Sequence, residues 1–265
     1  MRRGQLIGGF LLILFGGFML ADAMGIKLPN GSSLSSLFGP IALLIAGAWI
    51  LMGVFFRKEF KTEKVSIDLQ GAISADVKID HGAGELKLHS GANANEIAHG
   101  SFSGGLEQKA TRDGDRLKVR MKPARDVWEF PFGGPHHQID WDVALNADIP
   151  LSLRLDLGAD KSTLDLRDLN ITNLDLDMGA SDTKLTLPSR GRFRANLDVG
   201  AASLEITIPE GLSARINASV AAGDVQVDEA RFPRNGNHYQ SSDYETAANS
   251  VDMVVDAGAA SVKIK

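Results

Sequence analysis

The sequence predicts a mainly β protein in which an N-terminal transmembrane hairpin of two helices precedes a β-solenoid-like repeat domain. Three observations support this fold class. Two uncharged apolar runs open the chain, apolar and polar residues alternate from Val65 onward, and a Gly-Ala phrase returns at a 21-residue interval. Such alternation is typical of strands with one buried face. The alternative is an antiparallel β-sandwich in which each Gly-Ala turn closes a hairpin.

The first predicted domain, residues 1–56, holds the apolar runs 4–21 and 37–56. Each run has about the length that a helix needs to cross a bilayer. Basic residues flank the hairpin and continue through a basic linker at 57–64. The positive-inside rule then places the β-repeat domain on the cytoplasmic side of the bacterial cytoplasmic membrane. In the alternative, the first run is a cleaved signal peptide, and the placement of the β-repeat domain stays the same.

The second predicted domain, residues 65–265, is built on evenly spaced glycine corners. Each unit reads strand, Gly-Ala, strand and a variable loop, and alanine replaces the glycine at Ala221. A fixed period of this length indicates stacked coils that bury their apolar faces against one another. Twenty-one residues are too few for a strand–helix–strand crossover. The predicted corners are Gly82, Gly158, Gly179, Gly200 and Gly258.

An irregular aromatic insertion near residues 123–141 interrupts the alternation. Its aromatic side chains either cap the open end of the stack or form a docking surface, because exposed aromatic residues are enriched at interfaces. Two adjacent histidines in an extended segment point to opposite faces, which makes them poor ligands for one metal ion. The candidate partner surface is Trp128, Phe130, Phe132, His136, His137 and Trp141.

An aspartate stands two residues before each corner glycine, so stacking would align these carboxylates in a column. Asp156, Asp177 and Asp198 are therefore weak candidates for binding a cation such as calcium. Aspartate also favours corners because its side chain bonds its own backbone, so no metal site is assigned.

Composition and motifs argue against several function classes. The chain has no cysteine, which excludes disulfides and thiolate chemistry, and its net charge of −5 gives no reason to expect a nucleic-acid partner. It carries no nucleotide-binding loop, nucleophile elbow or zinc-protease motif. The sequence therefore predicts no catalytic residue, no cofactor and no enzyme.

Two stretches carry a family resemblance: WDVALNADIPLSLRLDLGADKSTLDLRDLNITNLDLDMGASDTKLTLP (141–188) and NSVDMVVDAGAASVKIK (249–265). With the apolar runs, they make the chain resemble bacterial LiaF-like membrane proteins and their toast-rack β domain. The resemblance implies a regulator of the cell-envelope stress response that contacts the bilayer and a membrane partner such as a sensor histidine kinase. It offers no active-site residues to transfer. The alternative function is an adhesin-like envelope scaffold that forms homo-oligomers through the β-repeat domain.

Overall fold

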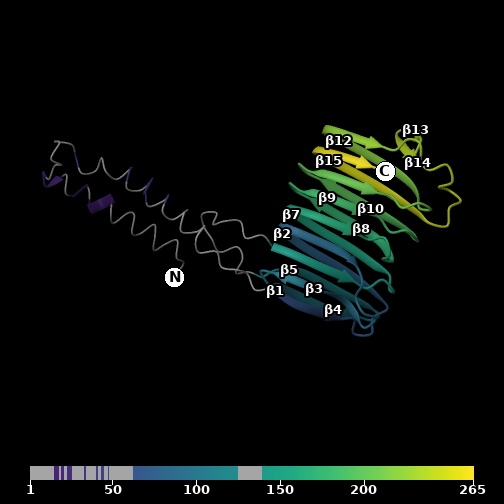
Figure 1. Ribbon diagram of the computed structural model, residues 1–265, viewed down its shortest axis with the longest axis horizontal. Helices are drawn as coiled ribbons and strands as arrows, with labels where there is room; N and C mark the ends of the chain where they lie inside the picture. Colours follow the sequence, from purple (N-terminus) through teal and green to yellow (C-terminus); the bar gives the residue numbers. More distant parts are fainter. Residues whose placement is uncertain are drawn as a thin grey trace. The chain divides into compact units, whose positions relative to one another are not determined.

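The computed structural model describes residues 62–124 and 139–265, together with isolated positions between 15 and 47. The two long ranges belong to one unit, Phe60–Val127 with His137–Lys265, and nearly all of their regular structure is strand (Figure 1). Its strands are β1 (Thr62–Asp68), β2 (Ser74–Ser90), β3 (Glu96–Ser103), β4 (Leu106–Asp113), β5 (Arg116–Pro123), β6 (Ile139–Leu145), β7 (Leu151–Asp165), β8 (Ile171–Met178), β9 (Asp182–Thr186), β10 (Arg192–Val199), β11 (Ser203–Thr207), β12 (Ser213–Val227), β13 (Arg234–Asn235), β14 (His238–Gln240) and β15 (Ser250–Ile264).

The centre of this unit is a stack of parallel strands. β2, β7, β8, β10, β15 and β12 lie side by side in that order, and each pairs with the next in parallel. Asp156 pairs with Asp177, and Asp177 pairs with Asp198, so the sequence period is the spacing between coils. The described residues therefore form the solenoid-like stack rather than the antiparallel alternative, and the mainly β prediction is confirmed.

The glycine corner changes the phase of the alternation within each coil. Before the corner in β7, Leu153, Leu155 and Leu157 are buried, and after it Ser162 and Leu164 are buried. The buried residues are thus odd-numbered before the corner and even-numbered after it. This shift lets both segments of the coil direct their apolar side chains into one core. The same change recurs in the other coils and builds a continuous core along the stack.

The coils do not follow one another in chain order. The C-terminal strand β15 lies between β10 and β12 (Figure 1), so Gly258, rather than Ala221, stacks beside Gly200. Val220 and Ala222 then flank Ala257 and Ala259 of β15. In this position β15 has a strand on both sides, and its Val262 and Ile264 are each only 1% exposed.

Antiparallel strand pairs lie at both ends of the stack, although β6 and β5 themselves pair with β2 in parallel. β6 pairs with the second half of β2, and β3 and then β1 extend the sheet beyond β6. β5 pairs with the first half of β2, and β4 forms a hairpin with β5. At the other end, β14 pairs with β12 only at Arg215 and Ile216. The last half of β12 is consequently an edge among the described strands.

The predicted transmembrane hairpin and its location in the cytoplasmic membrane need correction. Among the described positions, no helix combines the length and the apolarity needed to span a bilayer. Apolar composition meets one requirement only, because the bilayer core also demands an uninterrupted helix that pairs its own backbone groups. Most residues of the predicted spans 4–21 and 37–56 lie outside the described residues.

Two predicted boundaries also differ from the structure. The last residues of the predicted linker 57–64 belong to β1, which begins at Thr62. The predicted insertion 123–141 overlaps the end of β5 at Pro123 and the start of β6 at Ile139, and residues 125–138 lie outside the described residues.

Candidate functional site

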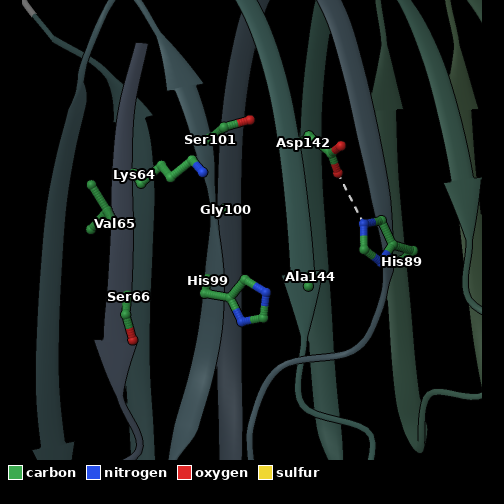
Figure 2. A pocket seen from close by; sticks show the side chains of 9 residues that line it. All are labelled: Lys64, Val65, Ser66, His89, His99, Gly100, Ser101, Asp142 and Ala144. Atoms are coloured by element: carbon green, nitrogen blue, oxygen red, sulfur yellow. Dashed lines mark hydrogen bonds and ion pairs between the residues drawn. The ribbon is translucent and has the colours of Figure 1, made fainter.

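A groove lies on the outer face of the sheet where β1, β3, β6 and β2 run side by side (Figure 2). It encloses a volume of about 440 Å³, within the size range of small ligand sites. We call it the histidine groove. Its lining residues are Lys64, Val65, Ser66, His89, His99, Gly100, Ser101, Asp142 and Ala144.

Strand register places the two histidines on either side of a small residue. His99 on β3 and His89 on β2 both pair with Ala144 on β6. Their rings turn toward each other across this alanine, which forms part of the floor (Figure 2). A Cβ added at Gly100 would lie 2.3 Å from the carbonyl oxygen of Asp142. Glycine at this position therefore allows the close approach of β3 to β6.

His89 is held by two acceptors. Its Nε2 lies 2.9 Å from Oδ1 of Asp142, and its Nδ1 lies 2.6 Å from the carbonyl oxygen of Ser90. Partial burial opposes charging of the ring, but the Ser90 carbonyl and the Asp142 carboxylate outweigh burial and raise the pKa of His89. Protonated His89 and the Asp142 carboxylate then form an ion pair on this wall of the groove.

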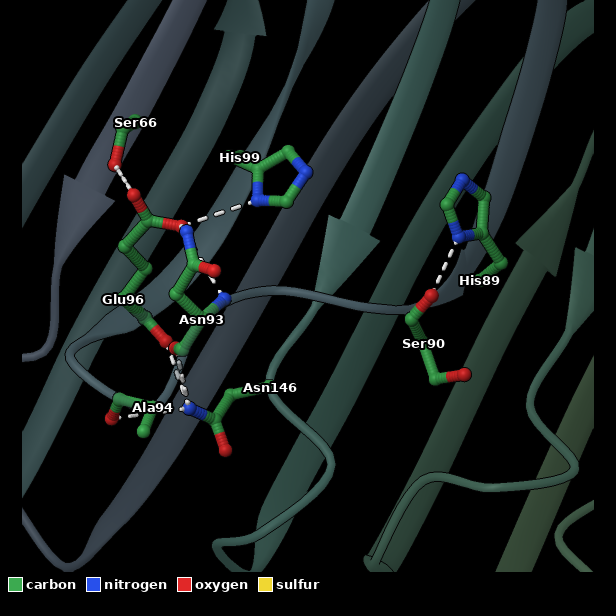
Figure 3. Close-up of polar contacts among 8 residues, drawn as sticks. All are labelled: Ser66, His89, Ser90, Asn93, Ala94, Glu96, His99 and Asn146. Carbon is green, nitrogen blue, oxygen red and sulfur yellow. Dashed lines mark hydrogen bonds and ion pairs between the residues drawn. The ribbon is translucent and has the colours of Figure 1, made fainter.

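Glu96 anchors the opposite wall (Figure 3). The Ser66 hydroxyl donates to Oε1 of Glu96 at 2.6 Å, and His99 Nδ1 lies 3.1 Å from Oε2. The side-chain amide of Asn93 donates to the same Oε2 at 2.8 Å. The Ser66 hydrogen bond, opposed by slight desolvation and supported by Asn93 and His99, lowers the pKa of Glu96 to about 2. The carboxylate therefore stays charged and orients the His99 ring.

The histidine and carboxylate side chains of the groove are paired with one another. Each histidine is paired with its own carboxylate, and the Ser66 hydroxyl donates to Glu96 instead of to a histidine. A nucleophile needs a base within hydrogen-bond reach, and the hydrogen bonds of Ser66, His89 and His99 to carboxylates do not join such a pair. In the part of the chain that the structure describes, no three acidic or histidine side chains are grouped to hold a metal ion.

The predicted corner glycines form a contiguous column. A Cβ added at Gly158 would lie 2.2 Å from the carbonyl oxygen of Gly82. An added Cβ would lie 2.9 Å from the Gly158 carbonyl oxygen at Gly179 and 2.8 Å from the Gly179 carbonyl oxygen at Gly200. At Gly258 it would lie 3.1 Å from the Gly200 carbonyl oxygen. Close backbone approach between coils, rather than a positive φ, is the reason for glycine at these corners.

The corner aspartates also align. Asp80, Asp156, Asp177, Asp198 and Asp256 are successive register partners across the parallel strands. Lys78 lies 3.2 Å from Asp80 and 2.5 Å from Asp156, and Arg120 lies 2.6 Å from Asp80. Basic side chains of the protein thus neutralise the first two carboxylates, and the cation candidates Asp156, Asp177 and Asp198 are not part of a metal-holding group among the described residues.

The structure places one member of the predicted partner surface in the core. Trp141 is 1% exposed and packs edge-to-face against Phe102, with ring centroids 5.0 Å apart. Alternation could have shown this, since Ile139, Trp141 and Val143 share the inward face of β6. The other predicted members, Trp128, Phe130, Phe132, His136 and His137, lie outside the described residues.

Sequence reasoning missed a buried polar cluster next to a corner. His81 Nδ1 lies 2.9 Å from Oδ2 of Asp160, and His81 Nε2 lies 2.9 Å from the carbonyl oxygen of Ile139. Ser162 donates to the same aspartate at 3.1 Å. The His81 and Asp160 side chains are both 0% exposed, so no substrate reaches them in this structure. The available signal was a departure from the repeat, because His81 pairs with Leu157 of the next coil.

The comparisons with known proteins agree with this architecture. A family model described as the N-terminal domain of toast_rack, DUF2154, matches residues 56–207. Among solved structures, the chain is similar to a candidate cell adhesion protein from Clostridium sporogenes at 22% identity and a TM-score of 0.63. That likeness covers 78% of this chain and 99% of the other, and it shows the shared fold. No curated protein matches the chain.

Proposed function

The chain belongs to the toast-rack family, and on this premise we propose that it is a LiaF-like, non-enzymatic regulator of the bacterial cell-envelope stress response. It acts by contact with a protein partner such as a sensor histidine kinase. Stacked repeats suit this role, because they present a broad and already ordered surface. Binding to such a surface costs little conformational entropy.

The histidine groove is the observation that carries the proposal. It combines the ammonium group of Lys64, two half-exposed imidazoles and the Asp142 carboxylate on one sheet face, and Glu96 bonds His99 from beside the lining. Charged groups arranged in this way select a complementary partner surface and set its association rate. Protonation of His89 offsets the charge of the Asp142 carboxylate, and the Lys64 ammonium group in the same lining then suits an acidic segment of the partner.

A groove-filling substitution tests the proposal. Ser101 lines the groove on β3, whereas Ser203 is exposed on β11 of the same sheet, away from the groove. A strain that lacks the protein and carries an envelope-stress reporter is complemented with the wild type, Ser101→Trp or Ser203→Trp. We expect the wild type and Ser203→Trp to restore reporter control and Ser101→Trp to fail, although all three proteins accumulate equally.

Cross-linking identifies the contact directly. A photoreactive residue at position 101 should capture the sensor kinase, and the same residue at position 203 should not. A reporter that ignores deletion of the protein would refute the stress role. Full complementation by Ser101→Trp would instead show that the groove is not the contact surface.

A separate observation favours a second function, that of an adhesin-like envelope scaffold. The last half of β12 has no described strand on its outer side, and such an edge is a template for pairing with another chain. Concentration-dependent self-association of the purified full chain would support this role, and a strictly monomeric chain would contradict it.

A further inference from the structure

The second half of β12 is an edge that the described residues leave uncovered. Val225 and Val227 face the core and are only half-buried, whereas their register partners Val262 and Ile264 on β15 are each 1% exposed. The exposure differs because β15 lies between β11 and β12, whereas this part of β12 pairs only with β15 among the described strands. One more strand would bury these valines as β15 buries its own residues.

This edge differs in charge from the other two long edges. Across residues 217–227, NASVAAGDVQV, the one charged side chain is Asp224. By contrast, β1 carries Glu63, Lys64 and Asp68, and β4 carries Glu107, Lys109, Arg112 and Asp113. Natural edges are protected from pairing by charged residues, and lysine above all. β1 and β4 carry that protection, and the β12 edge lacks it.

From these features we infer that β12 pairs antiparallel with β12 of a second copy, with Val225 opposite Val225 on a two-fold axis. This inference rests on the scaffold function proposed above and names its interface. In this register Gly223 lies opposite Val227 of the second copy, so that residues on the core-facing side of one strand pair with core-facing residues of the other. On the outer face Asp224 meets Gln226 of the second copy.

The sequence of the edge is complementary to itself in this register. The amide of Gln226 already donates to Oδ2 of Asp224 at 2.7 Å within one chain, which shows that the two groups match as donor and acceptor. A register centred on Asp224 would place two carboxylates opposite each other, which destabilises a strand pair. Two-fold antiparallel pairing also closes after two copies, since each copy uses the same edge.

The experiment measures the dissociation constant of the full chain by sedimentation over a wide concentration range. Gln226→Asp places a carboxylate opposite Asp224 at both symmetric positions, and we expect dimerisation to weaken about tenfold or more. The double variant Asp224→Lys with Gln226→Asp converts both positions into opposite charges and should restore the dimer. The matched control is Gln108→Asp, which makes the same exchange at an exposed position on β4.

Each outcome separates the interface from the scaffold proposal. Loss with Gln226→Asp, recovery in the double variant and no effect of Gln108→Asp support the β12 interface. A dimer that resists Gln226→Asp overturns this interface and leaves a scaffold that assembles through another surface. A chain that stays monomeric at every concentration overturns both. Circular dichroism verifies that each variant keeps its β structure.

Discussion

Replacing Gly158 with alanine tests whether the corner glycines are required by close packing between coils. The added Cβ would lie 2.2 Å from the carbonyl oxygen of Gly82, which is 1.2 Å less than the 3.4 Å where ordinary contact begins. The opposing atoms belong to the backbone, with the carbonyl carbon at 3.0 Å and Cα at 3.2 Å. Relief therefore requires β2 and β7 to separate at the corner.

The expected cost follows from two opposing effects. Overpacking of this kind destabilises by about 1–3 kcal/mol. Alanine also restricts the unfolded chain, which stabilises by about 0.4–1 kcal/mol, because Gly158 does not occupy the left-handed region. The net loss for Gly158→Ala is about 1.3 kcal/mol, which corresponds to a decrease in Tm of about 3–5 °C for a domain of this size.

Gly258→Ala is the matched comparison, because its Cβ would lie 3.1 Å from the carbonyl oxygen of Gly200. A shift of a few tenths of an ångström relieves that contact, so we expect a change within about 1 kcal/mol of zero. Thermal unfolding followed by circular dichroism measures both variants. Equal effects of the two substitutions, or a neutral Gly158→Ala, would refute the close-packing explanation.

Three further predictions concern the polar contacts. Asp160→Ala removes the hydrogen-bond partner of the buried His81 and should lower the free energy of unfolding by about 3 kcal/mol in urea titrations. The double variant His81→Leu with Asp160→Ser should recover most of that loss. If stability does not recover, the His81–Asp160 pair is needed for folding. Glu96 has a pKa lowered from 4.5 to about 2, so its contribution to stability is present above pH 4.5 and disappears as the pH falls toward 2. Glu96→Gln should therefore flatten the dependence of Tm on pH in that window, and an unchanged profile would contradict the assignment. Lys78→Met should raise the pKa of Asp80 in an NMR titration while changing stability by about 1 kcal/mol or less, because the pair is partly exposed.

Much of the stack could be predicted from local pattern. The spacing of Gly158, Gly179 and Gly200 equals the spacing of the coils, and the alternating leucines mark the buried face. The same pattern placed Trp141 on the inward face, so assigning it to a partner surface was an error of interpretation. The transmembrane prediction relied on the length, apolarity and basic flanks of two runs, and no helix among the described positions is long and apolar enough to span a membrane.

The histidine groove could not be predicted in this way. Its walls come from β1, β2, β3 and β6, which antiparallel and parallel pairings bring together without any repeat in sequence. His89 and His99 occupy ordinary outward positions of alternating strands, and nothing local distinguishes them from solvated surface residues. Their proximity depends on the register of each strand with β6.

The amino-acid sequence by itself determined the strand content, the glycine corners and the inward faces, because side-chain alternation and steric limits act within a few residues. Only the tertiary structure decided that β15 enters the stack between β10 and β12, leaving β12 at the edge. The order of the strands is set by pairings between segments far apart in the chain, which local alternation does not encode. Strand register likewise decided that His89 and His99 meet on either side of Ala144 at the other end of the stack.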